Sequence, residues 1–295
     1  MTKHIRNFLN GMAFGITETI PGVSGGTIAI ILGFYSELIE TVNHFTEDYR
    51  KYLKFLIPLI IGMASGILLF SSIIHYLLTN YSFPTMLFFI GLIIGIIPLV
   101  YKKIKEPGQR LKPNEIALIA VPMLFLMTVS GLKPETVTIP ADVIRGMGVS
   151  YMAFLFFIGV IAAAALVIPG VSGSFVMLLM GVYHVVVFSV SSIRHWLIDP
   201  SNLSLLLDIC KILMPFAIGV IIGGLSMARL IEKLLKDYHK VVYSVILGLL
   251  LGSVYVLFRE PIVFQSGVTG VTAAIGVITL LTGCAAAFTI GKKRL

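Results

Sequence analysis

The sequence IPGVSG occurs twice in this chain of 295 residues, at residues 20–25 and again at residues 168–173. Each copy interrupts a long apolar segment, about residues 8–42 and about residues 151–190. Proline removes a backbone donor and glycine makes a continuous helix costly, so each segment is predicted to be a helix, a break and a second helix. Each arm has only about 13 to 17 residues, which is short for a bilayer crossing. We interpret both segments as re-entrant hairpins, with two thin full spans each as the alternative.

The composition places the whole chain in a membrane. Apolar residues make up 57% of it and charged residues 12%, against about a quarter charged in soluble proteins. These values exclude a cytosolic enzyme, a secreted scaffold and a disordered chain. The net charge of +8 favours a membrane surface or nucleic acid, and the apolar fraction decides for membrane lipids, with no nucleic acid as partner. Cys210 and Cys284 lie far apart, so neither a disulfide framework nor a metal site is expected.

Six further apolar segments carry no interior charge and are read as transmembrane helices, although two are short. They are residues 55–78, 84–101, 116–131, 212–228, 241–258 and 268–290. If both hairpins re-enter, 17 of the Lys and Arg residues lie on one side and five on the other. The positive-inside rule then predicts that both termini are in the cytoplasm of a bacterial or archaeal cell.

The motif belongs to a longer internal repeat. Gly33 matches Gly181 at the same offset of 148 residues, and further along the offset becomes 157, so that Gly62 matches Gly219. The predicted fold is an all-α integral membrane protein with one hairpin plus three spans in each half. Three is an odd number, so the second half is predicted to be inverted, an architecture typical of secondary transporters. The halves are residues 1–132 and 147–291, joined by an external linker at 133–146.

The two breaks carry the chemistry of an anion site. Glycines let a ligand approach the backbone, hydroxyls donate hydrogen bonds, and the helix that follows each break begins with free N–H groups. In the alternative reading, each break is a kink whose serine satisfies freed carbonyls. The predicted phosphate-binding residues are Ser24, Gly25, Gly26, Thr27, Ser172, Gly173 and Ser174, and the predicted hinge residues are Pro21, Gly22, Pro169 and Gly170.

Glu18 is the one carboxylate placed well inside an apolar segment, and its repeat equivalent is Leu166. An acid inside a membrane is costly and is therefore a candidate for coupling to H⁺ or Na⁺; the alternative is a carboxylate that caps a backbone donor or pairs with a base. Arg145, Arg194 and Lys211 lie at the predicted outer side and are weaker candidates for capturing a lipid head group. Interfacial anchoring is the alternative for these three cations.

The stretch ETIPGVSGGT at residues 18–27, with IPGVSGSF at residues 168–175, resembles the polyprenyl-phosphate transporter family of bacteria and archaea (PopT). The resemblance covers about residues 8 to 290. The family commonly has Asp before its first Pro-Gly motif, where this chain has Glu18. The resemblance implies a flippase that returns undecaprenyl phosphate from the outer to the inner leaflet of the cytoplasmic membrane, for peptidoglycan and other envelope polymers.

Two other functions are weighed against this one. An inorganic or small organic anion transporter or channel would use the same breaks. A lipid-phosphate phosphatase would need a histidine nucleophile with clustered basic partners, and the six histidines show no such cluster in the sequence. The protein is therefore expected not to be an enzyme, to have no catalytic residues and to need no cofactor; a homo-oligomer is left open.

Overall fold

The computed structural model describes residues 3–18, 20, 23–105, 111–131, 148–264 and 267–293, and all regular elements in these ranges are helical. They pack as two compact units. The first comprises the described residues of Met1–Gly131, Ile168–Val171 and Arg229–Leu295, and the second those of Leu132–Val167 and Ser172–Ala228. The two units are described separately below.

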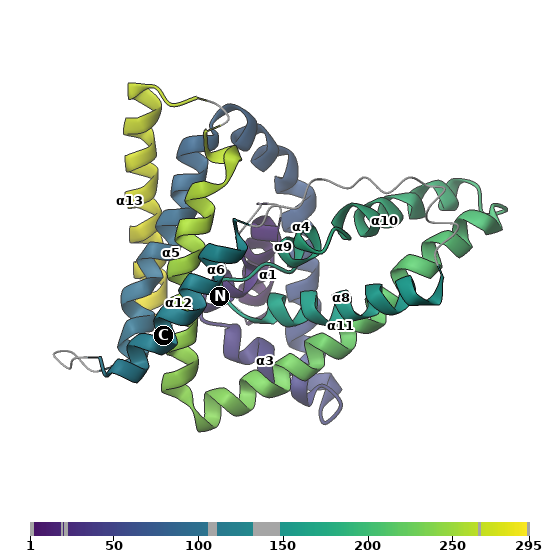
Figure 1. Cartoon of the computed structure of the whole chain (residues 1–295), viewed down its shortest axis with the longest axis horizontal. Helices are drawn as coiled ribbons and strands as arrows, with labels where there is room; N and C mark the ends of the chain where they lie inside the picture. The colour runs from purple at the N-terminus through teal and green to yellow at the C-terminus, as the bar shows by residue number, and fades with distance from the viewer. Residues whose placement is uncertain are drawn as a thin grey trace. The chain divides into compact units, whose positions relative to one another are not determined.

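The first unit begins with the hairpin helices and ends with the chain's last long helices (Figure 1). Its helices are α1 (Lys3–Glu18), α2 (Gly25–Ile31), α3 (Tyr35–His44), α4 (Tyr49–Asn80), α5 (Ser82–Ile104), α6 (Pro113–Val129), α12 (His239–Arg259), the 3-10 helix η1 (Pro261–Phe264) and α13 (Gly270–Lys292). The second unit contains α8 (Val149–Val167), α9 (Gly173–Leu179), α10 (Tyr183–Ile198) and most of α11 (Leu203–Asp237).

Among the described residues, six helices are long and apolar enough to cross a membrane: α4, α5, α8, α11, α12 and α13. Five of them contain all or nearly all of the predicted spans 55–78, 84–101, 212–228, 241–258 and 268–290. The predicted span at 116–131 is the exception, because α6 has 17 residues, which at about 1.5 Å per residue is less than the roughly 30 Å of a hydrocarbon core. A multi-pass membrane protein follows from the length and hydropathy of these helices.

The arms of the two predicted hairpins differ in length. In the first hairpin, α1 has 16 residues, and α2 and α3 are short helices that meet at an angle of 115°. In the second, α8 begins two residues before the predicted segment and has 19 residues, which is long enough to cross a membrane. The predicted arm length of 13 to 17 residues is therefore too short for α8, because the helix begins at Val149, before the predicted segment.

The two short helices after the breaks have the same local structure. α2 and α9 each have seven residues, and their N-cap residues Ser24 and Ser172 have φ −92° and −101° with ψ 129° in both. Each helix is followed by a glycine in the left-handed region, Gly33 at φ 69° and Gly181 at φ 71°. A left-handed glycine ends a helix at low cost because it has no Cβ. The repeated glycines therefore fix where both helices stop.

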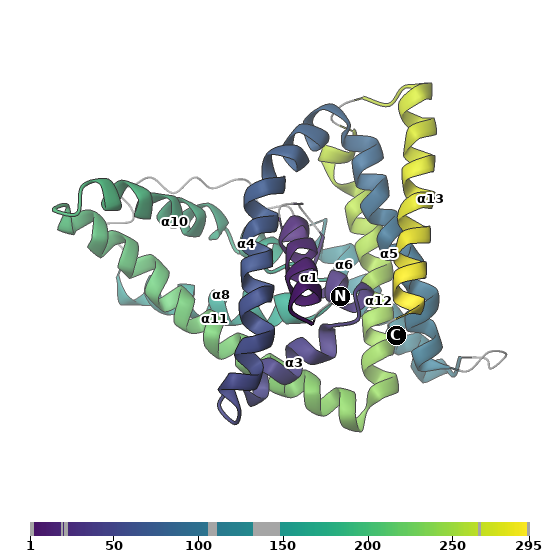
Figure 2. The ribbon, with the colours of Figure 1, turned by 180° about the vertical axis from the view of Figure 1, so that it is seen from behind.

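Close helix contacts also recur at the two offsets. A Cβ on Gly62 of α4 would lie 2.0 Å from the carbonyl oxygen of Phe8 in α1, and these helices lie side by side (Figure 2). In the second unit, a Cβ on Gly219 of α11 would lie 2.1 Å from the carbonyl oxygen of Phe156 in α8. Gly66 and Gly223 contact the next turn of the same partner helices in the same way. Only a residue without a side chain permits such an approach.

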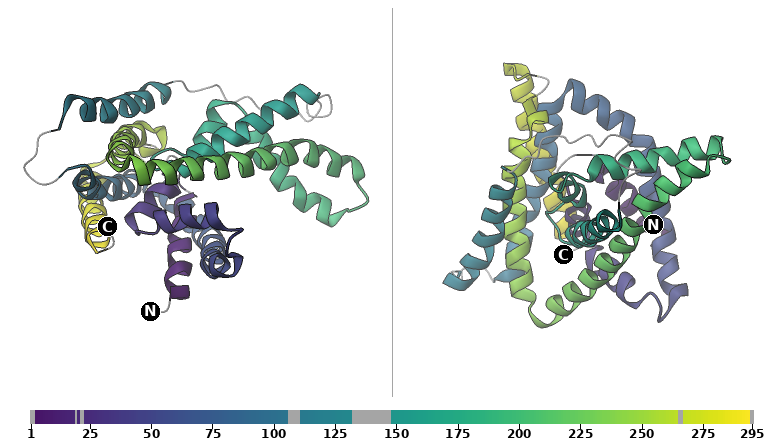
Figure 3. Two further views of the ribbon diagram at one scale, coloured as in Figure 1. Left: turned by 90° about the horizontal axis from the view of Figure 1, so that it is seen from below. Right: turned by 45° about the vertical axis from the view of Figure 1, so that its right-hand side comes forward.

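The third predicted span of each sequence half packs on the second span of the other half. A Cβ on Gly91 of α5 would lie 2.2 Å from the carbonyl oxygen of Leu280 in α13, and one on Gly248 of α12 would lie 2.1 Å from that of Ile119 in α6. α5, α12 and α13 lie beside one another in all views (Figure 1, Figure 2 and Figure 3). Both pairs belong to the first unit.

Candidate functional site

The first break holds a buried hydroxyl group. Ser24 precedes α2 and is 3% exposed, and within the described residues its Oγ has no hydrogen-bond partner. Its side chain does not cap α2 either. A buried hydroxyl without a partner costs about 1–3 kcal/mol. A ligand oxygen that accepted a hydrogen bond from Ser24 would recover that cost.

Glu18 lies beside the start of α2. A Cβ on Gly25 would lie 2.5 Å from Oε1 of Glu18 and 2.4 Å from Cζ of Phe14. The backbone N–H of Gly25 donates to the Glu18 carboxylate. The acid at the end of α1 therefore faces the N-terminal end of α2, where the partial positive charge of a helix is favourable for an anion. Gly25 and Gly26 are both buried in this region.

The second break contacts the first through Thr27. The backbone N–H of Gly170 donates to Oγ1 of Thr27 over 3.1 Å, and Oγ of Ser253 donates to the carbonyl oxygen of Gly170 over 2.7 Å. Gly170 has φ 89°, and a Cβ there would lie 3.0 Å from Cβ of Leu249. Glycine is therefore required at this position by both conformation and space. The structure joins two breaks that are 143 residues apart in the sequence.

Ile168 and Val171 hold the same break in the apolar core of the first unit. They pack against Leu126, Leu249 and Val256. Pro169 lies between them, followed by Gly170. Pro21 and Gly22, the equivalent predicted hinge residues, lie outside the described residues.

The hydroxyls of the second motif are satisfied by each other. Oγ of Ser172 and Oγ of Ser174 are 2.7 Å apart, within hydrogen-bonding distance. A Cβ on Gly173 would lie 2.7 Å from the carbonyl oxygen of Ala162, so this glycine serves the close approach of α9 to α8. The two motifs therefore share a backbone conformation and differ in their hydrogen bonding.

The predicted outer cations are only partly described. Lys211 of α11 lies 4.0 Å from Oδ1 of Asp208, one turn earlier on the same helix, and its side chain is 42% exposed. Arg194 lies in α10, and Arg145 lies outside the described residues. A long ion pair at an exposed site contributes little to stability, so Lys211 remains available for other anions.

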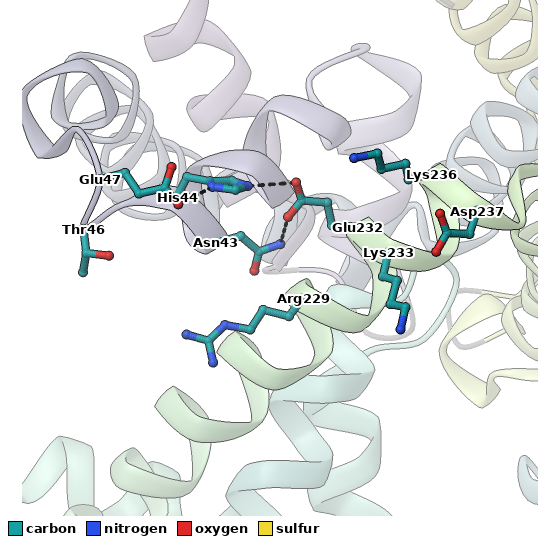
Figure 4. A pocket seen from close by; sticks show the side chains of 9 residues that line it. All are labelled: Asn43, His44, Thr46, Glu47, Arg229, Glu232, Lys233, Lys236 and Asp237. Carbon is teal, nitrogen blue, oxygen red and sulfur yellow. Dashed lines mark hydrogen bonds and ion pairs between the residues drawn. The ribbon is translucent and has the colours of Figure 1, made fainter.

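A polar pocket of about 640 Å³ was not predicted from the sequence (Figure 4). Nε2 of His44 lies 2.9 Å from Oε1 of Glu232, and Nδ2 of Asn43 donates to Oε2 of the same carboxylate. Nδ1 of His44 lies 2.8 Å from Oε1 of Glu47. Figure 4 shows these contacts tying the end of α3 to the last turns of α11. The remaining lining residues are Thr46, Arg229, Lys233, Lys236 and Asp237.

This pocket carries no short-range signal in the sequence. His44 and Glu232 are 188 residues apart in the sequence. Each lies near the charged end of a helix, and in the sequence such an end is indistinguishable from an ordinary solvated helix end. Its three Lys and Arg side chains are matched by three carboxylates, so no single-sign charge marks it as an anion site. Its contacts tie the first hairpin to the end of α11.

The comparisons with known proteins cover most of the chain. The family described as VCA0040-like, undecaprenyl phosphate translocase-like, matches residues 14–274. A protein of Staphylococcus aureus (strain NCTC 8325 / PS 47) named polyprenyl-phosphate transporter is 33% identical over 258 residues, which are 85% of this chain and 85% of that protein.

A protein of Vibrio cholerae serotype O1 (strain ATCC 39315 / El Tor Inaba N16961) with the same name is 29% identical over 265 residues, 85% of this chain and 76% of that protein. No solved structure matches the chain. Both relatives are named as transporters and not as enzymes. The resemblance predicted from the two motifs is confirmed, and the chain belongs to the undecaprenyl phosphate translocase-like family.

Proposed function

We propose that this protein moves polyprenyl phosphate, undecaprenyl phosphate in particular, from the outer to the inner leaflet of the cytoplasmic membrane for reuse in envelope polymer synthesis. The observation that carries the proposal is the buried hydroxyl of Ser24, which has no hydrogen-bond partner among the described residues, next to Gly25, which Glu18 contacts, in a chain whose relatives are named polyprenyl-phosphate transporters. A lipid phosphate must take a charged head group through hydrocarbon, which is costly unless the protein supplies hydrogen bonds.

In this proposal the head group binds at the first break. The hydroxyl of Ser24 and the N–H groups of Gly25 and Gly26 donate to phosphate oxygens, as backbone N–H groups do in other phosphate sites. Thr27 accepts from Gly170 and keeps its own hydroxyl proton to donate. Ser172, Gly173 and Ser174 of the second motif are proposed as further donors to the phosphate, which requires the hydrogen bond between the two serines to open.

Glu18 supplies the coupling. Its ionised carboxylate already accepts from Gly25, so it competes with a phosphate oxygen for the same donor. Two anions at one donor also repel each other. Protonation of Glu18 removes the repulsion and weakens its hydrogen bond with Gly25, which lets the phosphate bind, and release of the phosphate lets the proton leave. Na⁺ bound by the carboxylate would neutralise it in the same manner.

Alternating access completes the mechanism. The equivalent close contacts of α1 with α4 and of α8 with α11 support two similar halves, which we propose to be inverted in the membrane with both termini in the cytoplasm. Inverted halves can open toward either side around one site. Arg145, Arg194 and Lys211 are proposed to attract the head group from the outer surface.

The test is transport by the purified protein in liposomes. Labelled polyprenyl phosphate is placed in the outer leaflet, and its movement is followed with an imposed proton gradient, an imposed sodium gradient or neither. We expect protein-dependent lipid movement that one of the two gradients accelerates. Movement of inorganic phosphate with no movement of the lipid would favour the anion transporter, and release of phosphate from the lipid would indicate a phosphatase.

A further inference from the structure

An apolar groove of about 690 Å³ runs along α6 beside α12. Its wall is one face of α6 from Asn114 to Phe125, together with Val245 of α12. Val121 and Phe125 in this wall are 66% and 60% exposed. Asn114, at one end, is the only polar residue among those that line the groove.

The groove has the depth of one leaflet. Phe125 lies eleven positions after Asn114, which at a rise of about 1.5 Å per residue gives roughly 17 Å. This is about half of the roughly 30 Å hydrocarbon thickness of a bilayer. A lipid chain that entered at the Asn114 end would therefore be covered as far as about the middle of the membrane.

The end of the groove at Asn114 is basic. α6 and α12 run parallel, since Cβ atoms on Gly248 and Gly252 would lie 2.1 Å and 3.1 Å from the carbonyl oxygens of Ile119 and Met123. Both helices therefore begin at the same end. Lys112 directly precedes α6, Lys240 is the second residue of α12, and both lysines are exposed. Glu115 at this end is paired with Lys105 over 3.4 Å and also accepts from the backbone N–H of Lys112 over 2.7 Å. Three described lysines, Lys105, Lys112 and Lys240, therefore lie at this end with this carboxylate, which leaves net positive charge to meet an anion.

We propose that this groove binds the isoprenoid chain of polyprenyl phosphate, with the phosphate held between Lys112 and Lys240. The positive charge at the Asn114 end complements the negative charge of the phosphate. A single apolar groove with one polar end also fits a lipid that has one chain. The assignment rests on the proposed function and deepens it, because it gives the lipid a binding place in the leaflet where these lysines lie. By the charge distribution of the sequence, that leaflet is the cytoplasmic one.

Photocrosslinking tests the assignment directly. Benzoylphenylalanine replaces Val121 in the groove or, as the matched control, Leu124, which is 54% exposed on α6 and does not line the groove. In liposomes that contain polyprenyl phosphate, we expect at least tenfold more labelling of this lipid from position 121 than from position 124. Excess phosphatidylglycerol should not remove it. Equal labelling from the two positions, or full competition by phosphatidylglycerol, would overturn the proposal in favour of ordinary bilayer lipid.

Transport by variants gives a second, independent measurement. Val121→Trp fills the groove and is expected to lower the initial transport rate at least tenfold, whereas Leu124→Trp changes it less than twofold. Lys112→Gln with Lys240→Gln should lower the labelling from position 121 at least threefold, and Lys236→Gln should not.

The crosslinking result also separates this inference from the proposed function. If the unmodified protein moves polyprenyl phosphate but position 121 does not label it, only the groove assignment fails. If the unmodified protein moves no lipid while position 121 still labels it, the groove assignment stands and the proposed function fails. Because labelling is measured on a separate variant and requires no transport, misfolding of Val121→Trp would not affect this outcome.

Discussion

The two breaks can be compared residue by residue. Ser24 and Ser172 begin short helices of equal length with nearly equal backbone angles. Ser172 is hydrogen-bonded to Ser174, whereas the Ser24 hydroxyl is buried without a partner in the described structure. The residue equivalent to Ser174 is Gly26, which has no hydroxyl to offer. The duplicated backbone has therefore been kept, while one copy has a closed hydrogen-bonded pair and the other an open donor.

The two breaks also differ in a residue that precedes the repeated motif. Glu18 faces Gly25 at the first break, and its equivalent at the second is Leu166. If the two breaks had the same role, both would be expected to carry an acid at this position. We infer that the first break carries the exchange of the phosphate with a proton or cation, and that the second mainly positions the first through Gly170 and Thr27.

The largest effect is expected from Glu18→Gln. Loss of the titratable group should lower gradient-driven transport about 100-fold, about 2.7 kcal/mol in the barrier, and remove its dependence on external pH or sodium. Glu37→Gln is the control, because the Glu37 carboxylate forms an ion pair of 2.9 Å with Lys3 and lies outside the break. This variant should change transport less than threefold. Leu166→Glu in the Glu18→Gln background should not restore activity. Restoration would mean that the two breaks are interchangeable.

Gly62→Ala and Gly219→Ala test whether the halves are equivalent in packing. Each added methyl group meets a backbone oxygen about 2 Å away, and overpacking of this kind typically costs about 1–3 kcal/mol. Both variants should lower the thermal unfolding midpoint in detergent by similar amounts. Gly270→Ala is the control, since a Cβ there has nothing within 4 Å. A large effect in only one of the two halves would contradict their equivalence.

Ser24→Ala and Ser172→Ala separate function from stability. Ser24→Ala should lower transport about tenfold, equivalent to about 1.4 kcal/mol, while leaving the unfolding midpoint unchanged or higher, because an unpaired buried hydroxyl is removed. Ser172→Ala should lower transport less than threefold and lower the midpoint slightly, because Ser174 loses its partner. Equal transport losses in the two variants would show that both serines contact the head group alike.

The smallest effect is expected from Thr27→Val. The substitution keeps the shape of the side chain and removes the acceptor for the Gly170 N–H, at a cost of about 1 kcal/mol in unfolding free energy. Thr27→Ser keeps the acceptor and should restore most of the unfolding midpoint. If Thr27→Val is as stable as the parent protein, the contact between the two breaks does not contribute to holding them together.

Much of the local structure was predictable from the sequence. Pro169 and Gly170 interrupt helix for reasons that belong to the residues themselves, and Gly33 and Gly181 end the short helices at matching positions. The offsets of 148 and 157 residues also identify which contacts recur in α1 with α4 and in α8 with α11. Helix breaks and close glycine contacts depend on short-range sterics, which residue type alone controls.

The partners of the third spans were not predictable. α6 and α13 are apolar on all sides, so neither has a face that selects a neighbour, and a glycine in α5 or α12 has no side chain to specify its partner. The length of α8 was underestimated at its start, since no residue between Val149 and Tyr151 marks where the helix begins. In a membrane the hydrophobic effect does not favour one helix partner over another, because the lipid chains are as apolar as the helices.

By itself, the sequence determined the membrane class and the duplicated breaks with their glycines and hydroxyls, because hydropathy, proline and glycine act locally. Only the tertiary structure decided that Glu18 faces Gly25, that Thr27 holds Gly170, and that His44 meets Glu232. These are contacts between groups up to 188 residues apart in the chain. Hydrogen bonds of this kind require partners within about 3 Å, and only the folded chain brings them to that distance.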